Sequence, residues 1–289
     1  MRRSGALSRS GRLPPLGSKI LGASAALATA AFTLIDSNTA VAAPSYVTAC
    51  TTLDICYCIN SDFRDAIDAN VARVRQLIAT YKAQGKAIGY LSIPLSPAGG
   101  GSFAVNSEIA ASTAQSVTAR LGSRAAWLLN PGAEAGDRMN GASGADFMYM
   151  WTQILEGPKG LGEDFDFFYF AGPTDFAKYF ALTGQADLER LEAWFDTRVA
   201  QDPAFKTSVD QGGITKAGFR NYYGLRASVA FSYGSHDEWN IARLINERRR
   251  GAADFGIANQ LAVLFDGHPV TPGGYENPTA SGDVGRCIK

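Results

Sequence analysis

Apolar residues along much of the chain recur at spacings of three and four, the period of a helix with one buried face. The clearest case is the segment 62–84, with Asn60 or Ser61 as its cap and Gly85 as its end. The same reasoning predicts helices from Asn106 or Ser107 to Leu121, over 145–156, after the turn 172–175, twice within 187–224, and over 236–250.

Short, mostly apolar runs lie between the predicted helices and have the length of buried strands. We place strands at residues 87–95, 125–130, 165–171 and 260–265, and residues 225–233 form either a further strand, which we favour, or the end of a helix. Because strands and helices alternate, the sequence predicts a three-layer, doubly wound α/β fold with a mostly parallel sheet, of the flavodoxin or Rossmann-like kind. Residues 176–231 are expected to form a helical insertion in this fold.

The first 43 residues have the composition of an export signal. A basic stretch precedes an Ala- and Leu-rich run at residues 20–35, and small residues at 40–43 supply cleavage sites. We therefore expect residues 44–289 to form one secreted or periplasmic α/β domain, with no membrane association after cleavage. Arg2-Arg3 leaves both the Sec and the twin-arginine export routes open.

The charge balance argues against a nucleic-acid polymer as partner. The chain holds 27 basic and 27 acidic residues, and residues 1–43 contain five of the basic ones and one of the acidic ones, so the exported part has a net charge near −4. A nucleic-acid polymer favours a basic partner. We expect a small-molecule ligand instead, and neither a cofactor nor a metal.

The four cysteines, Cys50, Cys56, Cys58 and Cys287, all lie in the predicted mature chain. Four cysteines allow three pairings, and every complete pairing ties Cys287 to the 50–58 cluster. We expect no free thiol, which suits an oxidising compartment. The alternative, in which Cys56-x-Cys58 supplies metal or redox ligands, lacks a second Cys/His cluster nearby.

Polar residues and glycines gather at the predicted carboxyl ends of the strands, where doubly wound sheets bind ligands. The loop 96–102 after the first strand matches neither the dinucleotide nor the P-loop pattern. It is either a ligand loop or a flexible surface turn. The candidate substrate-binding residues are Ser92, Gly99, Gly100, Gly101, Asn130, Gly172, Gly234 and Asp237.

Glu238 is the candidate reactive group, because it lies in the first turn of the helix predicted at 236–250, where exposed N–H groups favour negative charge. A structural alternative is a capping box between Ser235 and Glu238. Asp166 is a second unusual carboxylate, since it opens a run of aromatic residues. It lies at an edge, is paired, or is functional.

These residues resemble the nucleoside 2-deoxyribosyltransferase-like family. The family's helix motif S-x-G-x-x-x-E-x-x-x-A is matched by Ser232-x-Gly234-x-x-x-Glu238-x-x-x-Ala242. Its acidic strand would correspond to residues 166–170, and its "NP" after the second strand to Asn130-Pro131. The resemblance covers residues 87–267 around the insertion, and it implies that Glu238 is a nucleophile that attacks the anomeric carbon of a nucleoside.

Cleavage of a C–N glycosidic bond needs a carboxylate at the anomeric carbon and a proton donor for the departing base. Glu238 suits the first role and Asp166 or Asp175 the second, with His236 as an alternative acid because its ordinary pKa lies near neutrality. The sequence therefore predicts an exported N-glycosidase or deoxyribosyltransferase-like enzyme. The competing hypothesis is a non-catalytic binding protein on the same fold.

Overall fold

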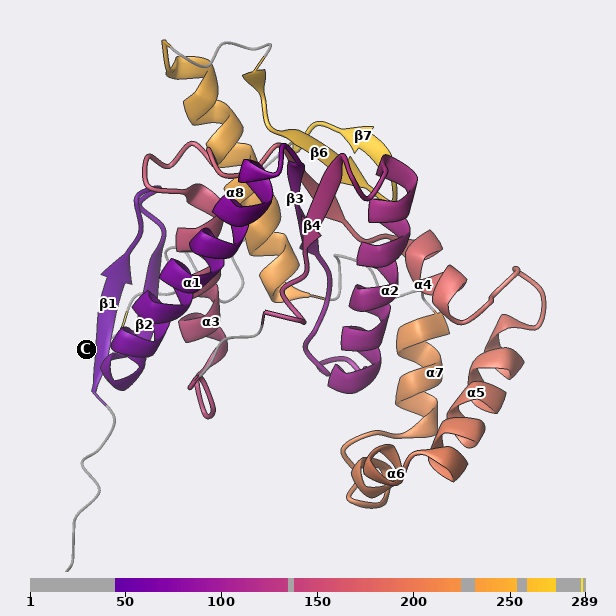
Figure 1. The fold of residues 1–289 in the computed structure, drawn as a ribbon. Coiled ribbons are helices and arrows are strands. Elements are labelled where there is room, and N and C mark those ends of the chain that lie inside the picture. The colour runs from indigo at the N-terminus through magenta and orange to yellow at the C-terminus, as the bar shows by residue number, and fades with distance from the viewer. Residues whose placement is uncertain (1–44, 135–137, 225–231, 254–258, 274–286, 288–289) are drawn as a thin grey trace, which may run out of the picture. The chain divides into compact units, whose positions relative to one another are not determined.

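The alternating pattern folds into a five-stranded sheet in the computed structural model, with the strand order β4-β3-β5-β6-β7 (Figure 1). The strands are β3 (Ala87–Ser92), β4 (Ala126–Leu129), β5 (Phe167–Phe170), β6 (Ala262–Phe265) and β7 (His268–Val270). β3 pairs in parallel with β4 and β5, β5 pairs in parallel with β6, and β7 adds an antiparallel edge. The predicted α/β fold with a mostly parallel sheet is confirmed.

The structure describes residues 45–134, 138–224, 232–253, 259–273 and 287. All of them belong to the unit Ala43–Lys289, which is distinct from the unit Met1–Ala42. The export signal predicted for residues 1–43 lies outside the described residues, as does most of the strand predicted at 225–233. None of the described helices is long and apolar enough to cross a membrane.

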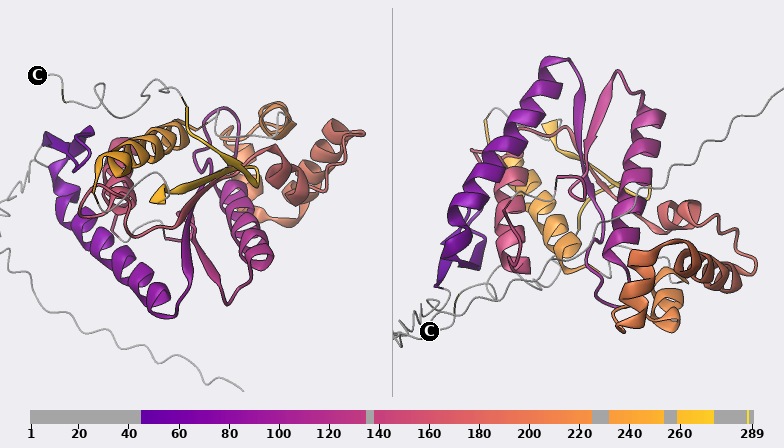
Figure 2. Two further views of the ribbon diagram at one scale, coloured as in Figure 1. Left: turned by 90° about the horizontal axis from the view of Figure 1, so that it is seen from above. Right: turned by 60° about the horizontal axis from the view of Figure 1, so that its bottom comes forward.

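Helices cover both faces of the sheet and give the three layers of a doubly wound fold (Figure 2). One face packs against α1 (Arg64–Ala83), α3 (Gly144–Glu156) and α8 (Tyr233–Gly251). The other face packs against α2 (Phe103–Leu121), α4 (Pro173–Tyr179) and the helical insertion, which contains α5 (Asp187–Gln201), α6 (Pro203–Asp210) and α7 (Lys216–Gly224).

The central strand β3 divides its side chains between these two cores, because successive residues of a strand point to opposite faces. Tyr90 belongs to the core beneath α1, α3 and α8, and Leu91 to the core beneath α2. Ser92 shares the face of Tyr90 and is the last residue of the strand. The sequence of β3 thus directs two hydroxyl groups toward the layer that contains α8.

A two-stranded hairpin, not predicted from the sequence, precedes the sheet and carries three of the four cysteines. Its strands β1 (Tyr46–Cys50) and β2 (Cys56–Asn60) pair antiparallel, and the short turn η1 (Ser61–Phe63) leads into α1. Cys50 is bonded to Cys56, and Cys58 to Cys287, so no described cysteine is free. The expected link between the chain ends is confirmed, and the metal or redox role of Cys56-x-Cys58 is wrong.

Two helices begin earlier than predicted because other residues cap them. Ser102 caps α2, with its Oγ accepting a hydrogen bond from the backbone N–H of Val105. Ser232 caps α8, with its Oγ 3.1 Å from the backbone N of Ser235. The cap of α2 predicted at Asn106 or Ser107 and the start of α8 predicted at His236 are therefore wrong. The earlier start of α8 changes the setting of Glu238.

Candidate functional site

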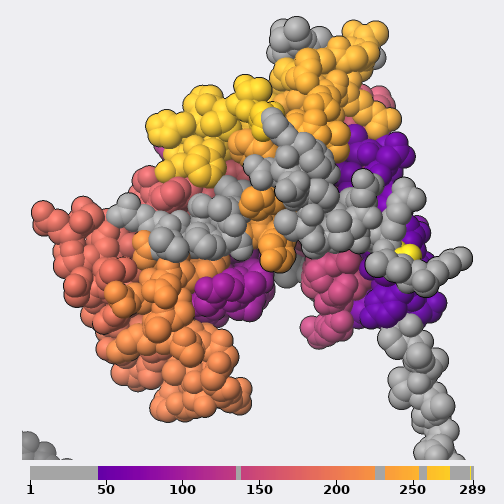
Figure 3. Space-filling view, turned by 180° about the vertical axis from the view of Figure 1, so that it is seen from behind, coloured from indigo at the N-terminus to yellow at the C-terminus, as the bar shows by residue number. Residues whose placement is uncertain are grey.

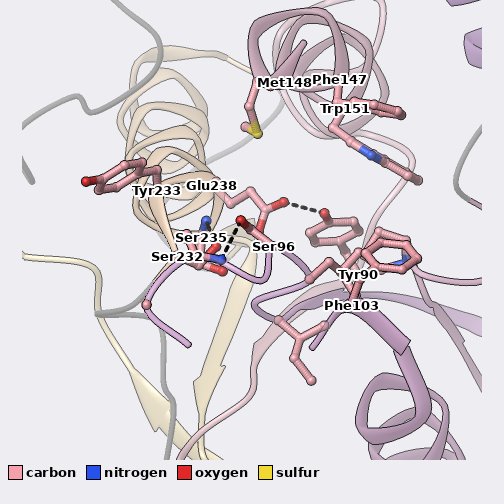
Figure 4. A pocket seen from close by; sticks show the side chains of 17 residues that line it. Tyr90, Ser96, Phe103, Phe147, Met148, Trp151, Ser232, Tyr233, Ser235 and Glu238 are labelled. Atoms are coloured by element: carbon pink, nitrogen blue, oxygen red, sulfur yellow. Dashed lines mark hydrogen bonds between the residues drawn. The ribbon is translucent and has the colours of Figure 1, made fainter. Parts of the chain in front are cut away.

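The cap at Ser232 places Glu238 beyond the first turn of α8, six residues after the cap. From that position the side chain cannot complete a capping box with Ser235, because a capping box joins residues three apart at the helix start. Figure 4 shows the Glu238 side chain extended from α8 toward the sheet, where it meets Tyr90. The capping-box interpretation of Glu238 is wrong.

Glu238 and Tyr90 form a buried hydrogen-bonded pair. The Tyr90 hydroxyl donates to Oε1 of Glu238 at 2.5 Å. Tyr90 is fully buried, and Glu238 is 7% exposed. Among the described residues, no other hydrogen bond of good geometry joins the Glu238 carboxylate, and Glu238 lines a cavity. Tyr90 thus holds one oxygen of a carboxylate at the cavity wall.

Burial makes the charged form of this carboxyl costly. Desolvation raises the pKa of Glu238 to about 7, although the hydroxyls of Ser92 and Tyr90 favour the charged form and hold the pKa down. The nearby Asp237 charge raises it further. Burial and the Glu238 charge also raise the pKa of Tyr90 well above its ordinary value. Glu238 therefore exchanges its proton near neutral pH, a property common at active sites.

Glu238 opens into a cavity of about 540 Å³, which we call the Glu238 pocket. Its size lies within the range for small-molecule sites, roughly 300 to 1,000 Å³. Figure 3 shows the surface recessed between the magenta residues near 100 and the pink residues near 145. The lining residues are Tyr90, Ile93, Leu95, Ser96, Ala98, Gly99, Phe103, Pro131, Gly144, Phe147, Met148, Trp151, Ser232, Tyr233, Gly234, Ser235 and Glu238.

The walls of the pocket are mostly apolar, and a few polar atoms gather near Glu238. Ser235 lines the cavity and is 1% exposed, and its buried hydroxyl has no hydrogen-bond partner among the described residues. Ser92 is equally buried behind the carboxylate, and its hydroxyl is near Glu238 without a hydrogen bond of good geometry. Buried hydroxyls without a partner are costly. A ligand hydroxyl would satisfy the one at Ser235.

The glycine-rich loop 96–102 forms one wall and is packed rather than free. Gly99 lines the pocket, whereas the backbone of Gly100 lies so close to Gly218 of α7 that a Cβ there would be 2.7 Å from the Gly218 oxygen. Gly101 is packed against the ring of Tyr222. The loop therefore needs glycine for close approach to the insertion as well as for its place at the pocket.

A hydrogen-bond chain fixes the same loop at both ends. The Tyr223 hydroxyl accepts from the backbone N of Ser102 at 3.1 Å and donates to Oδ1 of Asn106 at 2.7 Å. The Asn106 amide in turn donates to the carbonyls of Leu95 and Ser96. Asn106, predicted as a helix cap, instead connects the insertion to the pocket wall.

The two aspartates expected as proton donors lie elsewhere. Asp166 is exposed at the amino end of β5, where its Oδ2 accepts from the backbone N of Ile88 at 2.7 Å. Asp175 accepts from the Tyr169 hydroxyl and the backbone N of Gly172, and Tyr169 belongs to the opposite core. Burial raises the pKa of Asp175. Neither aspartate lines the Glu238 pocket, so the structure does not support their expected role in protonating a base there.

Of the other predicted residues, the structure brings Gly99 and Gly234 to the pocket beside Glu238. Ser92 does not line the pocket, but its hydroxyl acts on the Glu238 carboxyl. His236 and Asp237 do not line the pocket, although they flank it on α8. The remaining four residues serve packing or turns. Gly100, Gly101 and Gly172 are packed closely, Gly172 against Asp266. Asn130 accepts a hydrogen bond at Oδ1 from the backbone N of Gly132.

Several pocket residues escaped the sequence interpretation. Tyr90 lies in the strand predicted at 87–95, and Phe147 and Trp151 lie in the helix predicted at 145–156, but the sequence pattern marks none of them as a site residue. Phe147 and Trp151 line the pocket, whereas Met150 of the same helix is fully buried in the core. The available signal was the width of the apolar surface of α3, which is larger than one packed stripe requires.

The arrangement offers one titratable carboxyl, a buried phenol and an unsatisfied hydroxyl at the base of an apolar cavity. Among the described residues, no group of three or more His, Cys, Asp or Glu side chains could hold a metal ion. Comparisons with models of protein families, with curated proteins and with solved structures give no match for this chain. The case for function therefore rests on the geometry of the Glu238 pocket.

Proposed function

We propose that the protein is an exported enzyme that cleaves the N-glycosidic bond of a nucleoside-like small molecule, with Glu238 as nucleophile. The observation that carries the proposal is the position of Glu238, buried at the base of a ligand-sized cavity with one oxygen held by Tyr90. The disulfides, typical of proteins in oxidising compartments, support export. The resemblance of residues 232–242 to the nucleoside 2-deoxyribosyltransferase-like helix motif assigns the same role to Glu238.

The chemistry follows from the two oxygens of the carboxylate. Oε2 bonds to the anomeric carbon while the C–N bond breaks and its electron pair leaves with the base. Tyr90 holds Oε1 and limits the rotation of the carboxylate, so the attacking oxygen is already oriented. Water then attacks the anomeric carbon of the glycosyl ester, restores the Glu238 carboxylate and gives its proton to solvent, and solvent supplies the proton that the departed base of a neutral nucleoside takes up. The apolar walls keep the ester away from bulk water until the base has left.

The direct test is release of free base from a panel of nucleosides, separated by chromatography. We expect release by wild type and none by Glu238→Gln, because the neutral amide neither attacks nor stabilises a developing cation. The matched control is Asp175→Asn, which removes a carboxylate on the opposite face of the sheet and should retain activity. Equal release by wild type and Glu238→Gln would reject the proposal.

The second candidate is a non-catalytic exported protein that binds a small molecule. The observation that favours it is the single carboxyl in the described pocket wall, without the second acid that many glycosidases use. This function predicts that ligands raise the melting temperature without being consumed. Turnover that depends on Glu238 would exclude it.

A further inference from the structure

The described wall of the Glu238 pocket carries a single charged side chain, and that side chain is acidic. No lysine, arginine or histidine is among its described lining residues. A phosphate group would therefore approach the Glu238 carboxylate without a cation to offset the repulsion, which is strong in a partly desolvated site. A positively charged ligand would be attracted instead. The charge of the described wall thus favours a cationic ligand.

Aromatic residues line the pocket and favour a ligand of the same sign, although Tyr233 is 67% and Phe103 52% exposed. Phe147 and Trp151 line the pocket from α3, Phe103 from the start of α2, and Tyr233 from the start of α8. Figure 4 shows Phe147 and Trp151 on the opposite side of Tyr90 from Phe103. The faces of aromatic rings attract cations, and flat heterocycles stack on them. A flat cationic ring would stack on the aromatic walls of this cavity and be attracted to the carboxylate at its base.

The scarcity of acidic groups in the described pocket wall restricts which leaving groups can depart. Asp166 and Asp175 lie away from the cavity, so its described wall holds no carboxylic acid other than Glu238. A neutral nucleoside needs a proton on its base as the C–N bond breaks. A heterocycle joined to the sugar through a cationic nitrogen needs none, because it leaves as a neutral molecule.

We propose that the Glu238 pocket takes an N-glycoside with a cationic nitrogen heterocycle, of the N-ribosylpyridinium class, without a phosphate. The inference rests on the proposed function and narrows it to one substrate class. The ring lies among the aromatic walls beside the carboxylate, and the unsatisfied Ser235 hydroxyl binds a sugar hydroxyl. Oε2 of Glu238 bonds to the anomeric carbon, and the electron pair of the C–N bond neutralises the pyridinium nitrogen. Water attacks the resulting ester and releases the sugar and one proton to solvent.

Binding is tested with two small molecules that the enzyme cannot cleave, 1-methylnicotinamide as the cation and nicotinamide as its neutral counterpart. Calorimetry at about pH 8, above the pKa of Glu238, should show wild type preferring the cation by more than about tenfold. Glu238→Gln should lose this preference, and Asp175→Asn, which changes a carboxylate outside the pocket, should keep it. Equal or tighter binding of nicotinamide to wild type would overturn the proposal, as would an unchanged preference in Glu238→Gln. If Glu238→Gln does not fold, the wild-type ratio alone decides.

Turnover separates this inference from the proposed function. The substrates are nicotinamide riboside, its reduced form with a neutral ring, its 5′-phosphate, and inosine. We expect fastest release from the cationic riboside, with losses of at least about tenfold for the phosphate, the reduced form and inosine. Faster Glu238-dependent cleavage of inosine would overturn the substrate class and leave the proposed function standing. Tight cation binding without any cleavage would support the ligand class and reject the enzyme.

Discussion

Glu238 gains its reactivity from a position that costs the protein stability. A carboxyl with a pKa of about 7 in the folded chain and an ordinary value of 4.5 holds its proton longer in the folded state. The stability that this proton supplies is fully present below about pH 4.5 and is lost as pH rises through 7. At higher pH the folded protein contains a buried charge. Such a cost is typical of functional rather than structural residues.

At the residue scale we therefore expect Glu238→Gln to be more stable than wild type at pH 8, by on the order of 2 to 3 kcal/mol. The amide keeps an acceptor for Tyr90 and removes the buried charge. The difference should disappear near pH 4.5. Urea unfolding at both pH values measures it, with Glu247→Gln as control, since Glu247 is an exposed residue of the same helix. A loss of stability in Glu238→Gln at pH 8 would show that the carboxylate is structural.

Tyr90 should set the protonation of Glu238. Its hydroxyl hydrogen bond favours the carboxylate, so Tyr90→Phe should move the pKa of Glu238 above 7. Carbon-13 NMR of the glutamate carboxyls measures this pKa shift directly. Ser92 and Asp237, the other groups that act on Glu238, are the same in both proteins. Tyr169→Phe is the matched control, because its hydroxyl bonds Asp175 on the opposite face. An unmoved titration in Tyr90→Phe would mean that Tyr90 does not tune the carboxylate.

The sequence identified Glu238 because its motif is local, but it could not supply Tyr90, whose contact spans 148 residues. Period-two alternation gives the face of a strand residue and not its neighbour on another element. Asp166 illustrates the converse. Its place beside aromatic residues fits an edge, a paired or a functional carboxylate, and the structure pairs it with the backbone of β3 at the amino end of the sheet. The pairing of the strands, which the sequence pattern does not show, distinguishes the site residue Tyr90 from the structural residue Asp166.

At the element scale, the insertion supports the pocket through the glycine-rich loop. α7 brings Gly218 and Tyr222 against the loop, and Tyr223 fixes Ser102 and Asn106. The aromatic core of the insertion makes this support rigid, with Trp194 stacked on Phe219 at a centroid distance of 5.3 Å. The insertion thus acts on the site from the far side of the loop.

Gly100→Ala tests this coupling. Gly100 has a φ of +106° and its Cβ would be 2.7 Å from the Gly218 oxygen, so both strain and a clash follow. Gly212→Ala is the matched control, because φ is +75° but nothing lies within 4 Å. We expect about 1 kcal/mol of destabilisation for the control and at least about 1 kcal/mol more for Gly100→Ala, together with weaker ligand binding. Similar losses of stability and binding in both variants would disprove a role for the contact.

Helix periodicity predicted α1 and α3 closely, and their bounds follow the apolar repeat. It failed at the start of α2, because Ser102 and Asn106 are both good capping residues and only the loop decides between them. The sequence does not predict the β1–β2 hairpin or β7, because β1 and β2 lie in the cysteine cluster and β7 is only His268-Pro269-Val270, without an apolar run. β7 is reached through a turn at Asp266 and Gly267, both with positive φ, which the Asp-Gly pair of a hairpin favours.

At the scale of the whole molecule, the two disulfides differ in how much chain they close. Cys58–Cys287 joins residues 229 apart, and Cys50–Cys56 joins residues six apart. The chain-entropy model assigns on the order of 5 kcal/mol to the long loop and roughly 2 kcal/mol to the short one, before native-state strain. The bond near the C-terminus is therefore the more important one for stability.

We expect Cys58→Ser/Cys287→Ser to lose more unfolding free energy than Cys50→Ser/Cys56→Ser. Urea unfolding of the two double variants and the oxidised wild type, at one pH, makes the comparison. Each variant removes one disulfide and replaces two cysteines by serine, so the difference isolates loop length. A larger loss in the short-loop variant would contradict the entropic account and place the stabilisation in the hairpin itself.

The central claim is that Glu238 forms a bond to the sugar of its substrate. With an N-ribosylpyridinium that carries fluorine at the 2-position of the sugar, the ester on Glu238 should form but hydrolyse slowly. Fluorine destabilises the cationic transition state of both steps, whereas the good leaving group keeps the first step fast. Mass spectrometry of the wild-type protein after incubation should show one added fluoroglycosyl group, located by peptide mapping on Glu238. Base release without any label on Glu238 would contradict the account.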